Sequence, residues 1–175
     1  MHHEIERKFL VKKIPRLWSV RKVTQERYFL QRGDLYEEGV KRKGSQCFHE
    51  IKLLVAHNER TREIRKVSKE DFERLKARGT QVIVRDSYEL TKKSPIISIK
   101  KYKGIYYGLV LAEVEFDSVE EMEKFTPLSW MGTEVTETAL GKDARLVDLD
   151  EEHFKSLLHE LEERSHFSNS FEGYL

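Results

Sequence analysis

The sequence predicts an α+β protein that is mainly antiparallel β, with eight strands closed into a barrel and helices packed outside. Three observations lead to this prediction. Strand-like segments dominate the chain, several of them have one apolar and one charged face, and short turn sequences join many of them. For any single strand, a solvated face carrying ion pairs explains the charges equally well. Eight such strands together favour a barrel whose interior is the charged face.

The strands are recognised by runs of β-branched and aromatic residues in which apolar and polar side chains alternate. They span 3–11, 23–31, 35–43, 46–55, 61–67, 81–90, 96–102 and 108–117. Glycine-containing dipeptides typical of hairpin turns lie at Gly33-Asp34, Gly44-Ser45 and Lys103-Gly104. This spacing of strands and turns predicts neighbouring strands that run antiparallel.

Three helices separate or follow the strands. Ser68 is suited to cap a helix near 69–78, and Ser118 to cap one over 119–125. Residues 150–164 form the third helix, because their apolar residues fall on one helical stripe, and 165–175 is expected to be a tail. Nothing in the sequence resembles a linker or an internal repeat, so a single domain over 1–175 is expected.

Charge and cysteine content exclude several classes of protein. The chain has 175 residues with 32 Lys and Arg against 31 Asp and Glu, so its net charge of +1 favours neither nucleic acid nor an anionic membrane as a partner. No apolar run approaches the roughly 18 residues of a membrane span. A single cysteine, Cys47, excludes an internal disulfide and fits a reducing cytoplasm. The oligomeric state cannot be inferred from these features.

The first strand carries the most informative run, Glu4-Ile5-Glu6-Arg7-Lys8. A period of two residues places Glu4, Glu6 and Lys8 on one face. Carboxylates are preferred ligands of Mg²⁺, and lysine binds phosphate as a point charge. The run therefore suits a wet cavity that holds a divalent cation and a polyanion, although an exposed face with ion pairs would also accommodate it.

Later strands repeat this pattern of charges on one face. Glu113 and Glu115 alternate with apolar residues in the last predicted strand. The same period of two pairs further charged residues, namely Lys41 with Lys43 and Glu50 with Lys52, and places Arg85 opposite Val84. Such faces on several strands supply the charges of the predicted interior.

Three segments resemble the CYTH superfamily, the triphosphate tunnel metalloenzymes. Glu4 to Lys8 is similar to its N-terminal ExExK signature, Glu113-Val114-Glu115-Phe116 to its later acidic strand, and Glu134-Val135-Thr136 to its EVT element. The resemblance covers the chain from Glu4 to about Leu149. It implies an eight-stranded antiparallel tunnel that binds triphosphates together with Mg²⁺ or Mn²⁺.

The resemblance also implies roles for individual residues. The metal ligands would be Glu4, Glu6, Glu113 and Glu115. The substrate-binding residues would be Lys8, Lys41, Lys43, Lys52 and Arg85, and the residues with a catalytic role Lys8 and Glu6. A register shift that places Gly39 and Lys41 at the basic pair would remove Lys43 from this set.

The sequence departs from the family pattern at several positions that should face the tunnel. Lys41 and Lys43 stand where the family has arginines, and lysine lacks the bidentate fork of arginine. Ser87 stands at an expected basic position and Lys100 at an expected acidic one. An arginine expected within 137–145 is replaced by Leu140 or displaced to Arg145. These departures bear on the efficiency of catalysis more than on the fold.

The predicted function is metal-dependent hydrolysis of a small triphosphate, first of all inorganic triphosphate, by in-line attack of water on the terminal phosphate. The alternatives are a class IV adenylyl cyclase-like enzyme, a thiamine triphosphatase, and a weakened module that binds triphosphate or polyphosphate. The HF-containing signature associated with cyclases occurs only at His153-Phe154 and His166-Phe167, outside the expected barrel. The sequence leaves open which triphosphate is used and whether Mg²⁺ or Mn²⁺ is preferred.

Overall fold

The computed structural model describes the backbone of residues 2–56 and 59–171 and the side chains of residues 4–55 and 61–165. Its strands are β1 (His2–Val11), β2 (Lys22–Arg32), β3 (Tyr36–Lys43), β4 (Gln46–Ala56), β5 (Glu59–Val67), β6 (Gln81–Glu89), β7 (Ile96–Tyr102), β8 (Val110–Phe116) and β9 (Met131–Glu134). Its helices are α1 (Lys69–Lys76), η1 (Gly104–Tyr106), α2 (Val119–Lys124), α3 (Asp143–Leu146) and α4 (Glu151–Phe171). The protein is thus mainly antiparallel β with a few helices, as predicted.

The described strands form one nine-stranded sheet in the order β5-β4-β3-β2-β6-β7-β8-β1-β9. The predicted closed eight-stranded barrel is not what the structure shows. Strand β5 pairs with β1 only between His2 and Ile5, whereas β8 pairs with β1 from Ile5 to Leu10. Strand β9 takes the β5 side of β1 at Phe9 and Val11, so β5 and β1 do not pair along their full length. The sheet curls, and its two ends meet only at the start of β1.

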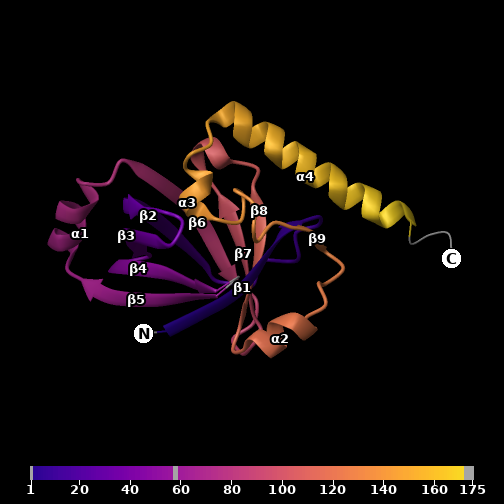
Figure 1. Cartoon of the computed structure of the whole chain (residues 1–175), viewed down its shortest axis with the longest axis horizontal. Helices are drawn as coiled ribbons and strands as arrows, with labels where there is room; N and C mark the ends of the chain where they lie inside the picture. The colour runs from indigo at the N-terminus through magenta and orange to yellow at the C-terminus, as the bar shows by residue number, and fades with distance from the viewer. Residues whose placement is uncertain (1, 57–58, 172–175) are drawn as a thin grey trace.

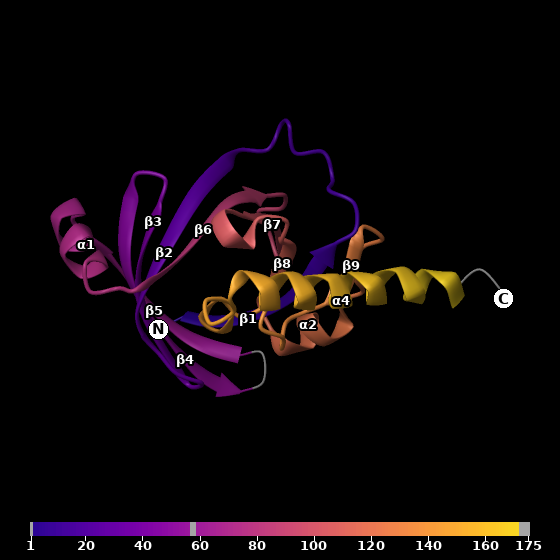
Figure 2. The same cartoon turned by 90° about the horizontal axis from the view of Figure 1, so that it is seen from above.

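Helices α1 and α2 pack on the outer face of the curled sheet, as expected, whereas α4 packs against apolar residues of the inner face (Figures 1 and 2). Helix α4 contributes Phe154 and Leu161 to the largest core cluster, which also includes residues of β1, β2, β6 and β8. Phe125, just after α2, packs against Phe9 and Phe116. Phe72 of α1 is fully buried against a third cluster. Leu10 and Leu111 of the largest cluster lie on the same strand faces as Lys8 and Glu113. The inner face is therefore apolar where α4 covers it, and its charged residues line the rest of the interior.

Two predicted helix starts are confirmed in detail. The Ser68 hydroxyl accepts a hydrogen bond from the Asp71 N–H at 3.0 Å, and the Ser118 hydroxyl accepts one from the Glu121 N–H at 3.1 Å. Each bond satisfies a backbone donor that has no partner inside its helix. These caps fix where the chain leaves the sheet and returns to it.

Three features differ from the sequence prediction. Strand β9 and helix α3 are additional, and each is only four residues long. Helix α4 runs from Glu151 to Phe171, so helical backbone continues through much of the segment expected as a tail, and residues 172–175 lie outside the described part. Among the described helices, none has the length and apolar character needed to cross a membrane.

Candidate triphosphate site

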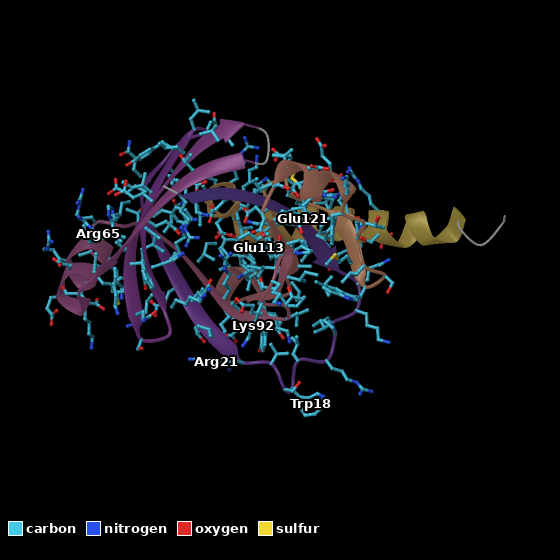
Figure 3. The ribbon with its side chains drawn as sticks, turned by 90° about the horizontal axis from the view of Figure 1, so that it is seen from below. Trp18, Arg21, Arg65, Lys92, Glu113 and Glu121 are labelled. Carbon is cyan, nitrogen blue, oxygen red and sulfur yellow. The ribbon has the colours of Figure 1, made fainter. Side chains whose placement is uncertain are left out.

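The curled sheet forms a cavity of about 1100 Å³, lined mainly by polar and charged side chains. One of these, Glu113, is labelled in Figure 3. All nine residues predicted for the site line this cavity: Glu4, Glu6, Lys8, Lys41, Lys43, Lys52, Arg85, Glu113 and Glu115. They come from strands β1, β3, β4, β6 and β8. The fold therefore brings together the residues that were predicted from the alternation of side chains and from the family resemblance.

Strands β1 and β8 place four carboxylates on one wall of the cavity. Glu6 is the direct cross-strand partner of Glu115, and Lys8 is the partner of Glu113. Burial raises the pKa of Glu115, and the neighbouring charges of Glu113, Glu4 and Glu6 raise it further. Like charges opposite each other destabilise a sheet, so this wall has the electrostatics of a cation site.

The described residues nonetheless contain no ready-made group of three or more His, Cys, Asp or Glu side chains that could hold a metal ion. Glu4 is instead held by two cations, with Lys52 Nζ at 2.8 Å and Arg62 Nη1 at 3.0 Å. The donor types and their crowding fit a divalent cation, since carboxylate oxygens are its preferred ligands. Small rotamer changes of Glu6, Glu113 and Glu115 would be needed to bring their oxygens together.

Lys8 lies at the centre of the wall formed by β1 and β8. Its Nζ is 3.1 Å from Glu6 Oε1 and 3.5 Å from Glu113 Oε2. Burial lowers the pKa of Lys8, but the charges of Glu6, Glu113 and Asp143 outweigh burial and raise it overall. Lys8 therefore stays an ammonium inside the cavity at neutral pH.

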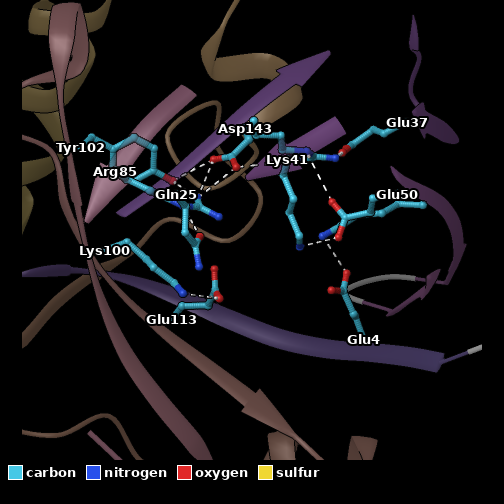
Figure 4. A network of polar contacts seen from close by, with 12 residues as sticks. Glu4, Gln25, Glu37, Lys41, Glu50, Arg85, Lys100, Tyr102, Glu113 and Asp143 are labelled. Carbon is cyan, nitrogen blue, oxygen red and sulfur yellow. Dashed lines mark hydrogen bonds and ion pairs between the residues drawn. The ribbon is translucent and has the colours of Figure 1, made fainter. Parts of the chain in front are cut away.

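Opposite this wall, Glu50 of β4 is a buried carboxylate surrounded by cations (Figure 4). Lys41 Nζ and Arg62 Nε each lie 2.8 Å from Glu50 Oε1, and Arg27 Nε lies 3.5 Å from Glu50 Oε2. Burial acts to raise the pKa of Glu50, but Lys52, Arg27, Lys41 and Arg62 hold it well below its usual range. We call Glu50, Arg27, Lys41 and Arg62 the Glu50 cluster.

The sequence reasoning missed two members of the Glu50 cluster, Arg27 and Arg62. Beside Arg27, a Cβ at Gly39 would come within 2.7 Å of the Tyr28 carbonyl oxygen, so the glycine allows strands β2 and β3 to approach closely here. Each arginine is one residue in an otherwise ordinary charged strand, and only a correct register between neighbouring strands would have placed them inside. The buried Nε atoms of both arginines lack a well-directed hydrogen bond in the structure, despite nearby carboxylates.

Lys41 has an environment different from that of Lys8. Burial lowers the pKa of Lys41 to about 8, since the neighbouring cations Arg62 and Lys52 oppose the effect of Glu50. Lys52 is more strongly paired, because Glu4 and Glu50 overcome burial and raise its pKa. Lys43, at the end of β3, is exposed at the edge of the cavity.

One end of the cavity is closed by Asp143, the first residue of α3. Arg85 Nη1 donates to its carboxylate at 3.0 and 3.1 Å, and the Tyr102 hydroxyl donates at 2.8 Å. Burial opposes ionisation, but Arg85, Lys8 and Arg27 lower the pKa of Asp143 to about 2. Asp143 is therefore an anion that anchors the predicted substrate-binding residue Arg85.

The arginine expected within 137–145 does not reach the cavity. Leu140 is fully buried in the main core cluster, and the exposed Arg145 lies 3.8 Å from Asp34. The cavity residues of this segment are Lys142 and Asp143. The fold thus places an acid close to where a base was expected, because the turn before α3 directs Asp143 inward.

Comparison with known proteins shows which solved structures resemble this one. No family model and no curated protein matches the sequence. Among solved structures, the inorganic triphosphatase NE1496 is 26% identical, with a TM-score of 0.61 over 86% of this chain and 97% of that chain. The nine converging charges and this similarity agree with the resemblance to the CYTH superfamily. The chain shares its fold with an inorganic triphosphatase.

Two further solved structures share the fold of this chain. Protein Pfu-838710-001 from Pyrococcus furiosus is 15% identical, with a TM-score of 0.54 over 86% of this chain and 93% of that chain. A candidate adenylate cyclase from Bacillus halodurans is 16% identical, with a TM-score of 0.51 over 70% of this chain and 86% of that chain. At these identities the likeness concerns the fold alone.

Proposed function

We propose that this protein hydrolyses small triphosphates, with inorganic triphosphate as the first substrate to test. The single observation that carries the proposal is the convergence of nine predicted charges on one cavity of about 1100 Å³. A triphosphate carries several negative charges, so it needs cations on more than one side. The similarity to an inorganic triphosphatase over 86% of the chain supports the same reaction.

The proposed roles are divided between the cationic and the acidic side chains of the cavity. Lys8, Lys41, Lys43, Lys52 and Arg85 would hold the phosphates. Glu4, Glu6, Glu113 and Glu115 would hold Mg²⁺ or Mn²⁺, which when bound supplies charge neutralisation and an activated water. Because Glu4 already pairs with Lys52 and Arg62, it would act as a ligand only after those pairs loosen.

Lys8 and Glu6 are the proposed catalytic residues. Lys8 Nζ would contact the phosphate that leaves or is transferred, and Glu6, 3.1 Å from that ammonium, would orient the attacking water. A loose phosphoryl-transfer transition state asks mainly for position and charge, which fixed side chains on one strand provide. The buried and incompletely satisfied Arg27 Nε and Arg62 Nε offer additional donors for phosphate oxygens.

We also propose that substrate binding closes the curled sheet into the eight-stranded tunnel of the family, within a single domain. Strands β5 and β1 already pair between His2 and Ile5. A polyanion held between Lys8 of β1 and the cations of the Glu50 cluster would draw these two sides together, because it would contact positive charge on both.

The direct test is phosphate release from tripolyphosphate, ATP and thiamine triphosphate, each with Mg²⁺ or Mn²⁺. The proposal expects metal-dependent turnover of at least one substrate, and tripolyphosphate is expected to be the best. Folding of the sample should be confirmed by circular dichroism. Absence of turnover with all three substrates in a folded sample would refute the proposal.

A second candidate is a module that binds triphosphate or polyphosphate with little turnover. The internal neutralisation of the Glu50 cluster favours it, because carboxylates already occupy several of the cations. Titration calorimetry separates the candidates. Tight tripolyphosphate binding without released phosphate supports the module, and a continuing heat of reaction excludes it.

For the cyclase alternative, we predict that the protein does not produce cyclic AMP. A cyclase must place the ribose 3′-oxygen in line with the α-phosphorus. His153 lies on α4 with its ring near Asp150, away from the cavity lining, so its HF dipeptide does not take part in the site. Chromatography after incubation with ATP and Mn²⁺ should show ADP and phosphate. Cyclic AMP with pyrophosphate would instead make the cyclase the function.

A further inference from the structure

Lys100 of β7 is a buried lysine in the cavity that the predicted site did not include. It is only 7% exposed and lines the cavity, while its neighbour Ile99 points to the apolar core. Its Nζ donates a hydrogen bond to the Ser87 hydroxyl at 2.9 Å. Ser87 and Lys100 are direct cross-strand partners on β6 and β7, so the contact is fixed by the sheet register.

The two residues differ in charge from what was expected at their positions. The family pattern predicted a base at Ser87 and an acid at Lys100. The structure shows that the Lys100 ammonium reaches the hydroxyl at position 87, so a cation lies beside that position although β7 provides it. The charge missing from β6 is thus supplied from the neighbouring strand.

The surroundings of Lys100 contain more positive than negative charge. Its nearest carboxylate is Glu113, with Oε1 at 3.5 Å (Figure 4). The other oxygen of Glu113 lies 3.5 Å from Lys8 Nζ. One carboxylate therefore serves two ammonium groups, each at a distance too long for a strong hydrogen bond. Arg85 and Lys43 add further positive charge near Lys100. Lys8 is also paired with Glu6 at 3.1 Å and Arg85 with Asp143 at 3.0 Å, whereas the ion pair of Lys100 with Glu113 is longer, at 3.5 Å. The buried ammonium of Lys100 is thus only partly compensated and is suited to bind an anion.

We propose that Lys100 binds a phosphate group of the triphosphate, together with Lys8 on the other side of Glu113. This assignment rests on the proposed function and makes Lys100 a substrate-binding residue. The alternative role is purely structural, as a counter-ion that keeps Glu113 charged. A substrate-binding ammonium can be moved to the neighbouring strand and still contact the phosphate, so moving it and removing it should have different effects on affinity.

The experiment measures tripolyphosphate binding by calorimetry in EDTA, and KM and kcat with Mg²⁺, for the wild type and three variants. Lys100→Met should raise Kd and KM by about 10- to 100-fold, the range expected when a charged hydrogen bond is lost, with a smaller change in kcat. Lys101→Met is the matched control, because Lys101 Nζ lies on the outer face, 5.4 Å from the Tyr88 ring centroid. It should change Kd by less than about 2-fold.

The double variant Ser87→Lys/Lys100→Ser returns the ammonium to β6. It should recover most of the affinity lost in Lys100→Met, and it also covers the case in which the single variant is unstable. Wild-type affinity in Lys100→Met, or no recovery in a folded double variant, would overturn the assignment while leaving the proposed function intact. Absence of tripolyphosphate binding and of turnover in the wild type would overturn both.

Discussion

Glu6 and Glu115 lie directly opposite each other on the antiparallel strands β1 and β8. Both line the cavity, and the pKa of Glu115 is raised by burial and by the surrounding carboxylates. Two acids rarely face each other across a ladder unless something positive lies between or beside them. The pair therefore provides a direct way to test for a cation in this wall of the cavity.

Mg²⁺ or Mn²⁺ should stabilise the wild-type protein, and Glu115→Gln should remove most of that effect. In the absence of metal, the same variant should melt at a higher temperature, because it relieves repulsion among the carboxylates. Thermal unfolding with and without metal measures both changes, which should amount to a few degrees each. Glu123→Gln, at an exposed position of α2, is the control. A metal response in Glu115→Gln equal to that of the wild type would contradict the assignment.

Lys8→Met should chiefly weaken substrate binding. Its ammonium lies within 3.5 Å of both Glu6 and Glu113, and removing it takes away a phosphate partner while keeping the carboxylates. We expect KM for tripolyphosphate to rise by about 10-fold or more. Steady-state kinetics at several metal concentrations would measure it. A change confined to the metal dependence would show that Lys8 supports the metal wall instead.

Asp143→Asn should destabilise the fold, because it leaves the buried guanidinium of Arg85 without its carboxylate. Removing one partner of a buried ion pair costs about 3 kcal/mol, which urea unfolding can measure. Asp148→Asn is a suitable control, since Asp148 forms a more exposed pair with Arg32. Equal stability of the two variants would rule out an anchoring role for Asp143.

The lowered pKa of Asp143 also predicts that the stability of the protein depends on pH in the acidic range. Its pKa is lowered to about 2 from the usual 3.8, so its contribution is complete above pH 3.8 and disappears as the pH falls towards 2. The wild type should lose stability across this window, and Asp143→Asn should lose less. Urea unfolding at about pH 4.5 and about pH 2.5 would compare the two. If the wild type and Asp143→Asn lost the same amount of stability between these pH values, the acid sensitivity would belong to other carboxylates.

Lys41 should give the activity an alkaline limit. Its pKa of about 8 means that the free protein loses this ammonium as the pH rises through 8, and affinity for a polyanion should fall with it. The profile of kcat/KM against pH would report this limb. Lys41→Arg should move the limb to higher pH, because arginine stays charged. An unchanged limb would mean that another group or the substrate itself titrates there.

Much of the fold could be predicted because local patterns determine it. Eight predicted strands match β1 to β8 within a few residues, since their alternation is long and regular. Strand β9 was missed because four residues, Met131–Glu134, carry too little periodicity. Helix α3 was missed for the same reason, and its first residue, Asp143, proved to be part of the cavity.

The sequence by itself determined which side chains share one face of a strand. In a strand, side chains alternate by geometry, so Glu4, Glu6 and Lys8 had to share one face whatever their partners. Only the tertiary structure decided which charges meet. Arg85 and Asp143 are 58 residues apart, and their contact depends on how α3 closes the end of the curled sheet. Likewise, strand register decided that Arg62 reaches Glu50 and Lys100 reaches Ser87, because a shift of one residue would turn each away from the cavity.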